Sequence, residues 1–416
     1  MSENIEKTVF DGREEPMKKT VILGVTGGIA AYKAAQLTSD LKKMDLDVHV
    51  IMTRNATEFV SPLTFETLSG HRVSVDTFDR NFEYHVQHVS LAKQADVFVI
   101  APATANVIAK LAHGLADDML TTTFLACSCT KIICPAMNTG MLENPATQEN
   151  LRLLKAHGMR IVEADSGLLA CGDVGKGRLA PLAVIEDEIE QALIKEKPLA
   201  GLKVLVTAGP TREALDPVRY LTNHSSGKMG YAIAKAARNW GAKVTLVHGP
   251  TALPALRGVE DQPVTSAQSM AEAVFSRASE SDLIIKAAAV ADYTPVETAS
   301  EKIKKTDGEF QLTLKRTQDI LKAVGERKRD DQVLCGFAME TEQLLARART
   351  KLASKHADLI VANDLRESGA GFGIDTNRVT VITASGEETL PLMRKEDLAY
   401  ELLERCLAIL KEKREK

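Results

Sequence analysis

The 416-residue sequence lacks the features of several large protein classes. Its 52 basic and 56 acidic side chains give a formal net charge of -4, without the basic excess typical of general nucleic-acid or membrane-surface binding. No apolar run approaches the roughly 20 residues that cross a bilayer. The first 17 residues are polar and acidic, and we expect a short tail there, neither a signal peptide nor a transit peptide. The sequence therefore predicts small-molecule partners, with no nucleic acid and no membrane.

Cysteine is also scarce. The chain has six, too few for a disulfide scaffold of this length, and a reduced cytoplasmic setting fits best. Cys127, Cys129 and Cys134 lie close together, in and after an apolar helical run and at a strand end. Because their spacing is not that of a zinc site, we expect buried structural thiols.

From Lys18 onward, short apolar strands alternate with helical segments. This alternation predicts βαβ units and parallel sheets, and the length allows two to three domains. Pro198 and Gly201 mark a boundary, so we expect a polar tail over 1–17, one domain over 18–197 and another over 198–416. The fold class is α/β, with two doubly wound, Rossmann-like domains. The second ends with a small antiparallel appendage, a hairpin with a Ser-Gly turn within residues 378–392.

Each block opens with a strand that stops at a Thr and glycines, in residues 18–33 and 201–213. Such turns leave backbone N–H groups directed at one spot, where phosphate binds. The first turn, GVTGGIAA around Gly27, lacks the G-x-G-x-x-G spacing, and no acidic residue ends the next strand to bind a ribose. We therefore favour a mononucleotide or flavin phosphate over NAD. A tight turn that binds nothing is the alternative.

Three further segments of the first block carry polar or reactive groups at strand ends or in a loop. APATAN (101–106) follows the strand DVFVI, and its Thr104 and Asn106 are either ligand contacts or helix caps. PAMN (135–138) repeats the pattern with a proline and an amide. SGLLACGDVGKGR (166–178) is a glycine-rich loop, in which Cys171 is expected to be mobile and accessible.

In this order and spacing, TGGIAAYK, HVSLAK, APATAN, PAMN and ACGDVGKGR resemble the flavin-dependent cysteine decarboxylases of coenzyme A biosynthesis. The resemblance implies a flavodoxin-like domain that binds FMN. It places the catalytic histidine, amide and proton-donating cysteine at His88, Asn138 and Cys171. The cofactor contacts that it implies are Gly27, Gly28, Ile29, Thr53, Ala103, Thr104 and Asn106.

The residue types suit that chemistry. A carboxylate beside an amide nitrogen has no electron sink, so flavin would first oxidise the neighbouring thiol to a thioaldehyde. Asn138 would hold the substrate carboxylate without a repelling charge, Cys171 would donate a proton, and His88 would accept the thiol proton. His85 competes with His88 for that role, and a structural histidine at a helix start is the alternative.

The second block is richest in motifs over residues 207–230, TAGPTREALDPVRYLTNHSSGKMG. NHSSGKMG is not a P-loop, because only one glycine precedes Lys228 and Met229 follows it. Downstream, AAAVADY contains Asp292 at a strand end, and EKIKK (301–305) has three lysines within four positions. These lysines form either a solvated surface or a clamp for a triphosphate.

TAGPTRE, DPVRYLTNHSSGKMG, AAVADY and KIKK resemble the phosphopantothenate–cysteine ligases that follow the decarboxylase in bacterial bifunctional proteins. The resemblance implies that CTP and Mg²⁺ activate phosphopantothenate as an acyl cytidylate, which the amine of cysteine then attacks. It assigns Asn223 to the acyl phosphate and Lys302 to the catalytic step. The implied CTP contacts are Lys286, Ala287, Ala288, Asp292, Lys302, Gln318, Asp319, Ile320, Leu321, Phe337, Lys351 and Lys355.

Two points of the ligase resemblance stay open. Lys286 stands where a small or neutral residue is expected, and Lys351 and Lys355 also fit a charged helix face. No protein ligand for Mg²⁺ is identified, and we expect the phosphates of CTP to hold the ion.

We therefore expect a bifunctional enzyme that makes phosphopantothenoylcysteine and then phosphopantetheine. The resemblance also implies a homo-oligomer, with trimeric decarboxylase units and dimeric ligase units combined in a dodecamer. An inactive flavin-binding regulator is a competing hypothesis, and intact His88, Asn138, Cys171, Asn223 and Lys302 argue against it. An NAD oxidoreductase is another, disfavoured by the missing fingerprint.

Overall fold

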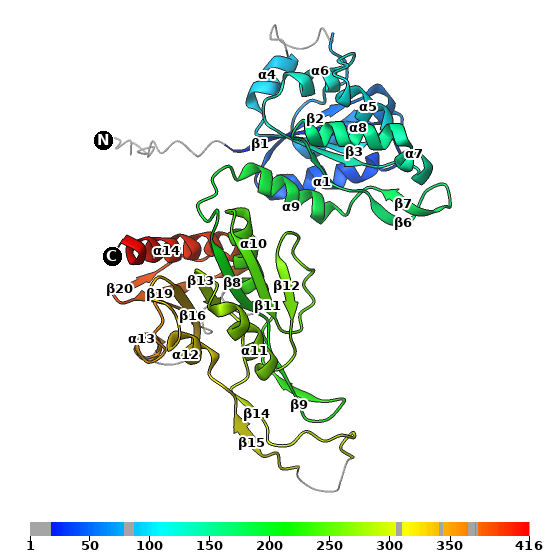
Figure 1. Cartoon of the computed structure of the whole chain (residues 1–416). Coiled ribbons are helices and arrows are strands. Elements are labelled where there is room, and N and C mark those ends of the chain that lie inside the picture. Colours follow the sequence, from blue (N-terminus) through cyan, green and yellow to red (C-terminus); the bar gives the residue numbers. More distant parts are fainter. Residues whose placement is uncertain are drawn as a thin grey trace, which may run out of the picture. The chain divides into compact units, whose positions relative to one another are not determined.

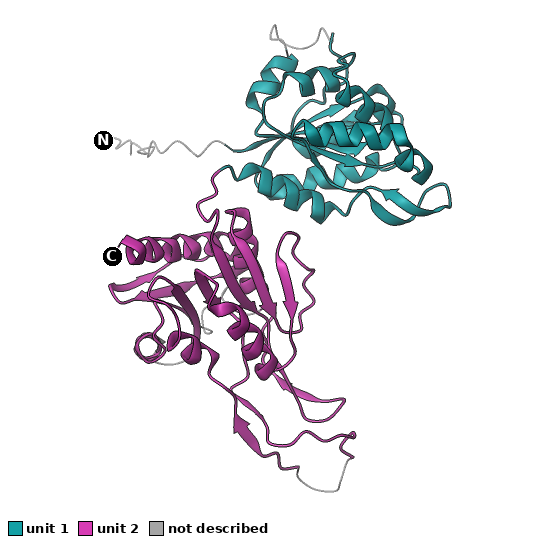
Figure 2. Cartoon of the chain, in the orientation of Figure 1, with its two compact units in different colours: residues 1–195 teal, residues 196–416 magenta. Residues whose placement is uncertain are grey.

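The computed structural model describes residues 18–78, 87–304, 310–340, 344–364, 371 and 373–415. The chain divides into two compact units, unit 1 over residues 1–195 and unit 2 over 196–416 (Figures 1 and 2). Each unit contains a mainly parallel sheet covered by helices, which confirms the predicted α/β class. Among the described residues, no helix combines the length and apolar character that crossing a membrane requires.

The sheet of unit 1 has five parallel strands in the flavodoxin-like order 2-1-3-4-5. In that order they are β2 (Asp47–Met52), β1 (Thr20–Val25), β3 (Val97–Ala103), β4 (Thr130–Pro135) and β5 (Arg160–Ile161). Every residue of β3 is buried, as expected for an apolar strand covered on both faces.

Helices cover both faces of this sheet, and alternate side chains of each strand enter two separate cores. On β1, Val21 and Leu23 pack on one side and Ile22 on the other. The first core takes side chains from α1 (Ala31–Lys43), α3 (Pro62–Ser69) and α9 (Leu182–Leu193). The second takes them from α4 (Gln87–Gln94), α5 (Ala105–Ala112), α6 (Met119–Ala126) and α8 (Pro145–Ala156).

Three shorter elements of unit 1 lie beside the sheet. They are α2 (Arg54–Thr57), α7 (Thr139–Glu143) and a hairpin of β6 (Asp165–Leu168) and β7 (Val174–Arg178). The prediction that residues 166–178 form a loop throughout is wrong. They pair as antiparallel strands, and only residues 169–173 form the turn.

The sheet of unit 2 has eight strands, of which the first six are parallel. In spatial order they are β12 (Glu260–Pro263), β11 (Lys243–His248), β8 (Lys203–Ala208), β13 (Leu283–Lys286), β16 (Val333–Glu340), β17 (Leu359–Asp364), β19 (Val379–Thr383) and β20 (Gly386–Thr389). β19 and β20 form the predicted antiparallel hairpin, and β19 also pairs with β17. The appendage is therefore part of the main sheet.

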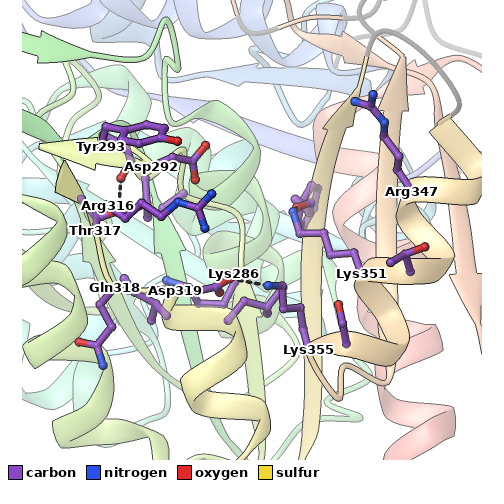
Figure 3. Close-up of a pocket in the computed structure, with 18 of the residues that line it drawn as sticks. Lys286, Asp292, Tyr293, Arg316, Thr317, Gln318, Asp319, Arg347, Lys351 and Lys355 are labelled. Carbon is purple, nitrogen blue, oxygen red and sulfur yellow. Dashed lines mark hydrogen bonds and ion pairs between the residues drawn. The ribbon is translucent and has the colours of Figure 1, made fainter. Parts of the chain in front are cut away.

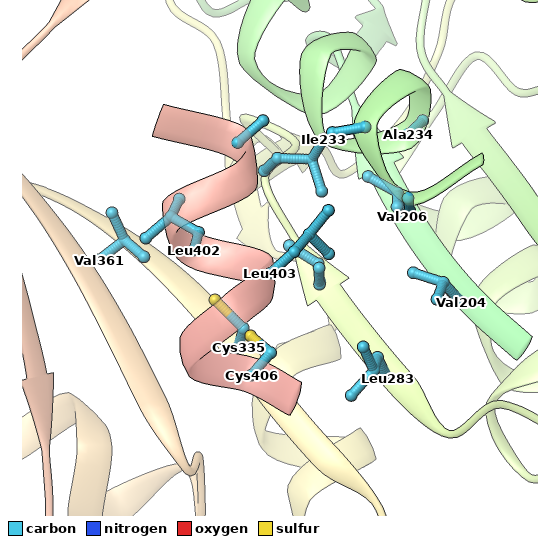
Figure 4. Packing of buried hydrophobic residues seen from close by; sticks show 14 of the residues in the cluster. Val204, Val206, Ile233, Ala234, Leu283, Cys335, Val361, Leu402, Leu403 and Cys406 are labelled. Carbon is cyan, nitrogen blue, oxygen red and sulfur yellow. The ribbon is translucent and has the colours of Figure 1, made fainter. Parts of the chain in front are cut away.

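Helices also cover both faces of the second sheet. α10 (Lys228–Asn239) and α14 (Lys395–Glu415) pack on one face, where Leu402 and Cys406 lie near Val361 and Cys335 (Figure 4). α11 (Ala267–Ala278), α12 (Ile320–Gly325) and α13 (Leu344–Ser354) pack on the other. Ser266 is the N-cap of α11 and forms a capping box with Ser269. Small ribbons form from β9 (Arg212–Ala214) with β10 (Tyr220–Thr222), β14 (Tyr293–Pro295) with β15 (Leu314–Arg316), and β18 (Thr376–Asn377) with β21 (Met393–Arg394).

Candidate functional sites

The candidate site of unit 1 is a cavity of about 610 Å³ at the carboxyl ends of β1, β3 and β4. In this strand order, β1 and β3 flank the point where the chain switches direction across the sheet, which is where such folds bind ligands. The hairpin β6–β7 closes one side, and most of the wall is apolar, with Ile29, Met137, Met141, Leu168 and Leu179 among its residues.

A buried threonine joins the two strand ends that form the floor of this cavity. Thr26 Oγ1 donates to the carbonyl of Pro102 at 2.7 Å and accepts from the backbone N–H of Thr104 at 3.0 Å. A Cβ on Gly27 would lie 2.4 Å from the Cβ of Asn55, so only glycine fits there. A Cβ on Gly28 would meet nothing closer than Thr104 Cγ2 at 3.7 Å, and Gly28 borders open space.

Four of the seven predicted cofactor contacts line the cavity. They are Gly27, Gly28, Ile29 and Thr104. Thr104 precedes α5 without capping it through its side chain, so the capping alternative is not observed. Ala103 is fully buried in the core, Asn106 is exposed on the first turn of α5, and neither lines the cavity.

Thr53, the seventh predicted contact, lies beside the same turn. Its backbone N–H donates to Val25, the last residue of β1, at 3.0 Å. Its Oγ1 is buried and has no hydrogen-bond partner among the described residues. An unpaired hydroxyl at this position and an uncapped α5 start fit a phosphate, and the apolar wall fits a flat ring system. The residues present are therefore compatible with FMN.

Asn138, Cys171 and Asp173 form a small polar cluster at the edge of the cavity. Asn138 Nδ2 lies 3.5 Å from Cys171 Sγ and donates to Asp173 Oδ2 at 3.3 Å. Cys171 Sγ donates to the same Asp173 oxygen at 3.2 Å. The predicted amide and thiol are thus brought together, and Cys171 is exposed as expected. Asp173 was missed, because an acidic residue two positions after a cysteine indicates nothing by itself.

Two glycines allow the hairpin to approach the loop that carries Asn138. A Cβ on Gly177 would lie 2.2 Å from the carbonyl oxygen of Met137, and one on Gly175 would lie 2.4 Å from Thr139 Oγ1. The backbone N–H of Met137 donates to the carbonyl of Gly177 at 3.0 Å. The glycines of the GKGR segment therefore allow close packing of the hairpin against the Asn138 loop, in addition to any flexibility that they give.

His88 is not part of this cluster. It lies on the first turn of α4, half-buried, and is not among the residues that line the cavity. α4 packs beside α6. The competing His85 lies outside the described residues. The catalytic role of His88 stays a prediction.

The candidate site of unit 2 is a cavity of about 800 Å³ at the carboxyl ends of β13 and β16 (Figure 3). Ten predicted nucleotide contacts line it: Lys286, Ala288, Asp292, Gln318, Asp319, Ile320, Leu321, Phe337, Lys351 and Lys355. Ala287 packs against the core on the other face of the sheet. Arg316 and Arg347 also line the cavity. They were not predicted, because neither arginine belongs to a sequence motif that indicates nucleotide binding.

Hydrogen bonds hold two of the lysines in place. Lys351 Nζ donates to the carbonyl of Phe337 at 2.8 Å, and Lys355 Nζ donates to Asp319 Oδ2 at 2.6 Å. Asp319 also caps α12 by accepting from the backbone N–H of Lys322 at 2.9 Å. Although burial opposes ionisation of Asp319, these bonds hold its pKa below the usual value.

Lys286 differs from the other cavity lysines. It is the last residue of β13, only 7% exposed, and burial lowers its pKa to about 7. A small or neutral residue was expected at this position, and the structure shows instead a buried amine with no hydrogen-bond partner among the described residues.

Asn223 and Lys302 do not line this cavity. Asn223 Nδ2 donates to the carbonyl of Ala289 at 3.1 Å, next to the lining residue Val290. Lys302 is exposed, in the segment between β14 and β15. The structure therefore brings Asn223 near the cavity and leaves Lys302 on a separate loop.

A buried carboxylate anchors the Lys302 loop. Asp216 accepts from the backbone N–H of Ile303 at 3.2 Å and from Arg219 Nε at 2.9 Å, and Arg219 Nη2 donates to the carbonyl of Ile303 at 2.7 Å. The bond from Arg219 is the main reason that the pKa of Asp216 lies well below its usual value. Asp216 was missed, although its place in the DPVR motif was the available signal.

Two family models match the chain. The model described as Flavoprotein matches residues 11–194, and the model described as DNA/pantothenate metabolism flavoprotein C-terminal domain matches residues 199–410.

Individual relatives are similar along most of the chain. The coenzyme A biosynthesis bifunctional protein CoaBC of Bacillus subtilis (strain 168) is 50% identical over 398 residues, covering 95% of this chain and 98% of that protein. A cysteine/cysteine sulfinic acid decarboxylase from an unknown prokaryotic organism is 44% identical over 357 residues, covering 84% and 99%. The crystal structure of the C-terminal domain of a CoaBC protein is 44% identical, with a TM-score of 0.45, and covers 52% of this chain and 100% of that one.

Proposed function

The chain belongs to the family of bifunctional coenzyme A biosynthesis proteins, and we propose that it catalyses both of the family's reactions. Unit 2 joins cysteine to phosphopantothenate at the expense of CTP, and unit 1 decarboxylates the product to phosphopantetheine with FMN. The observation that carries the proposal is the contact of Asn138 with Cys171, 3.5 Å apart, at a cavity on the switch point of a flavodoxin-like sheet.

In the decarboxylase unit, FMN supplies reversible two-electron oxidation of the substrate thiol, which creates the electron sink that loss of carbon dioxide needs. Gly28 and Thr104 would hold the cofactor, and the unpaired Thr53 hydroxyl would bind its phosphate. Asn138 orients the substrate carboxylate without adding negative charge. Cys171 donates the final proton, and Asp173 holds the thiol and the amide next to each other by accepting from both.

In the ligase unit, an oxygen of the phosphopantothenate carboxylate attacks the α-phosphorus of CTP, and pyrophosphate leaves. The amine of cysteine then attacks the acyl carbon, and CMP leaves with the electron pair of the acyl–oxygen bond. Lys351 and Lys355 bind the nucleotide, Asn223 contacts the acyl phosphate, and Lys302 stabilises the charge that develops. The phosphates of CTP hold Mg²⁺.

We also propose that the protein works as a homo-oligomer in the cytoplasm, with trimeric unit 1, dimeric unit 2 and a dodecamer as the assembly. Support comes from His88, which lies outside the cavity that contains Cys171. A site that uses both residues is completed by a second copy of the chain. Large exposed apolar side chains on unit 1, such as Leu115 at 57% and Leu125 at 59%, fit burial between copies. The free cysteines fit a reducing compartment.

A second candidate substrate follows from one relative. The similarity to a cysteine/cysteine sulfinic acid decarboxylase makes free cysteine an alternative substrate for unit 1. The polar cluster of Asn138, Cys171 and Asp173 would serve either amino-acid carboxylate. We favour phosphopantothenoylcysteine as the substrate of unit 1, because it is the product of the ligation that we propose for unit 2.

The test compares the two substrates on the FMN-loaded full chain. Phosphopantothenoylcysteine and free cysteine are supplied separately, and carbon dioxide release is measured with each. We expect a kcat/KM for phosphopantothenoylcysteine far above that for cysteine. Cys171→Ser is the control for the decarboxylase site, because it should release carbon dioxide but stall before the reduced product forms, and Lys302→Gln should leave both steps unchanged. A preference for free cysteine would overturn the assignment of unit 1.

A further inference from the structure

The side chain of Lys286 is an unpaired amine inside the cavity of unit 2. In β13 it lies on the same face as Ile284, and the side chains of Ile284 and Ala288 pack in one apolar core. Its Nζ is buried and has no hydrogen-bond partner among the described residues. Burial of an unpaired polar group is costly, and an amine kept in such a place needs a partner from elsewhere. Because Lys286 lines the cavity, that partner is a ligand.

The charge of the cavity indicates which ligand. Besides Lys286, its charged lining residues are Asp292, Arg316, Asp319, Arg347, Lys351 and Lys355. These four cations outnumber the two carboxylates, and Asp319 already accepts hydrogen bonds from Lys355 and from a backbone N–H. Figure 3 shows Lys286 beside Asp319 and Lys355. The surplus of positive charge suits a polyphosphate.

We propose that Lys286 is a phosphate ligand of this cavity and takes up a proton when the triphosphate of CTP enters. The inference rests on the proposed ligase function and adds a dependence on pH that the function does not require.

The sign of the pH dependence follows from proton linkage. Burial brings the pKa of Lys286 to about 7 in the empty cavity, so much of this amine is neutral near neutral pH. A phosphate oxygen at hydrogen-bond distance favours the charged amine and raises that pKa. The bound state then holds more protons, and affinity is highest below pH 7. Affinity falls as pH rises above 7, by at most about tenfold per pH unit.

The experiment is calorimetric titration of the full chain with CTP and Mg²⁺ at pH 7, 8 and 9. Each titration is repeated in two buffers of different ionisation enthalpy, which counts the protons taken up. Working above pH 7 avoids titration of the nucleotide's own terminal phosphate, with a pKa near 6. We expect uptake of up to one proton per CTP, and affinity at pH 9 at least about tenfold below that at pH 7.

Substitutions identify the group that takes up the proton. Lys286→Met keeps the side-chain length, and we expect it to lose the proton uptake and the pH dependence together. Lys286→Gln is a second variant should the methionine variant fold poorly. Lys355→Met is the matched control, because Lys355 lines the same cavity but already has Asp319 as a partner. It should weaken binding and keep the proton uptake.

Two fragments of the nucleotide locate the contact. Tripolyphosphate should reproduce the uptake at Lys286, and cytidine should not. Wild-type affinity and pH dependence in Lys286→Met would overturn the proposal, and so would an effect seen with cytidine alone. If the wild-type chain binds tripolyphosphate with this uptake but not CTP, the ligase function fails and the role of Lys286 stands. Binding of neither ligand overturns both.

Discussion

The substitution Gly177→Ala tests how the decarboxylase site is built. Gly177 lies in β7 and its carbonyl accepts from the backbone N–H of Met137, one residue before Asn138. The added Cβ would lie 2.2 Å from the Met137 carbonyl oxygen, which is a backbone atom and cannot rotate away. The hairpin therefore has to move away from the Asn138 loop, and Cys171 moves with it.

The magnitude follows from two contributions. Overpacking of this kind costs about 1–3 kcal/mol, and φ of +154° adds about 1 kcal/mol for a residue with a Cβ. Relief of the clash requires a shift on the order of 1 Å, and misplacement of that size can reduce a rate by about 10²-fold. We expect formation of phosphopantetheine from phosphopantothenoylcysteine to fall by about 10²-fold, with ligation by unit 2 unchanged.

The assay measures phosphopantetheine formation and CMP formation by the same preparation, beside its thermal unfolding. Gly158→Ala is the matched control, because Gly158 has a φ of +83° but nothing within 4 Å of the added Cβ. It should cost about 1 kcal/mol of stability and leave decarboxylation intact. Formation of phosphopantetheine by Gly177→Ala at the wild-type rate would refute the claim that this contact positions Cys171.

Three further outcomes are expected. Cys171→Ser should release carbon dioxide but form the reduced product about 10²–10⁴-fold more slowly, and product mass at the native rate would remove Cys171 as proton donor. Lys302→Gln should bind CTP in part but form the amide about 10²–10³-fold more slowly, and normal ligation in a quenched assay would remove Lys302 from the mechanism. Lys286→Met should raise the free energy of unfolding at pH 7, because the folded pKa of about 7 lies below the unfolded value of about 10.4. The increase in the free energy of unfolding, measured with denaturant, should become smaller toward pH 10. An equal increase at pH 7 and pH 10 would contradict this reasoning.

The main sheets were predictable because their pattern is local and repeated. β3 is a continuous apolar run, and the alternation of such runs with helices requires parallel strands with crossovers. The α11 start at Ser266 and the hairpin of β19 and β20 also follow from short-range turn and cap chemistry. The strand order creates the cavity at the switch point. It cannot be predicted from the hydrophobic periodicity, which does not determine which strands become neighbours.

The parts of the sites that escaped prediction depend on contacts between distant segments. The pairing of β6 with β7 rests on strands rich in glycine, which carry no alternating pattern. Asp173 is informative only once the hairpin brings it to Asn138, 35 positions earlier in the chain. Asp216 meets Ile303 across 87 positions. Residue types and strand ends can be predicted from the sequence, but the contacts that they make with distant segments of the chain cannot.

The central claim is that one chain performs ligation and decarboxylation in sequence. Its most direct test is mass analysis of the products after the FMN-loaded full chain is incubated with phosphopantothenate, cysteine, CTP and Mg²⁺. The account predicts phosphopantetheine, with the decarboxylated but not yet re-reduced intermediate accumulating instead in Cys171→Ala. Phosphopantothenoylcysteine alone from the wild-type chain would contradict the decarboxylase assignment, and no new product at all would contradict the bifunctional account.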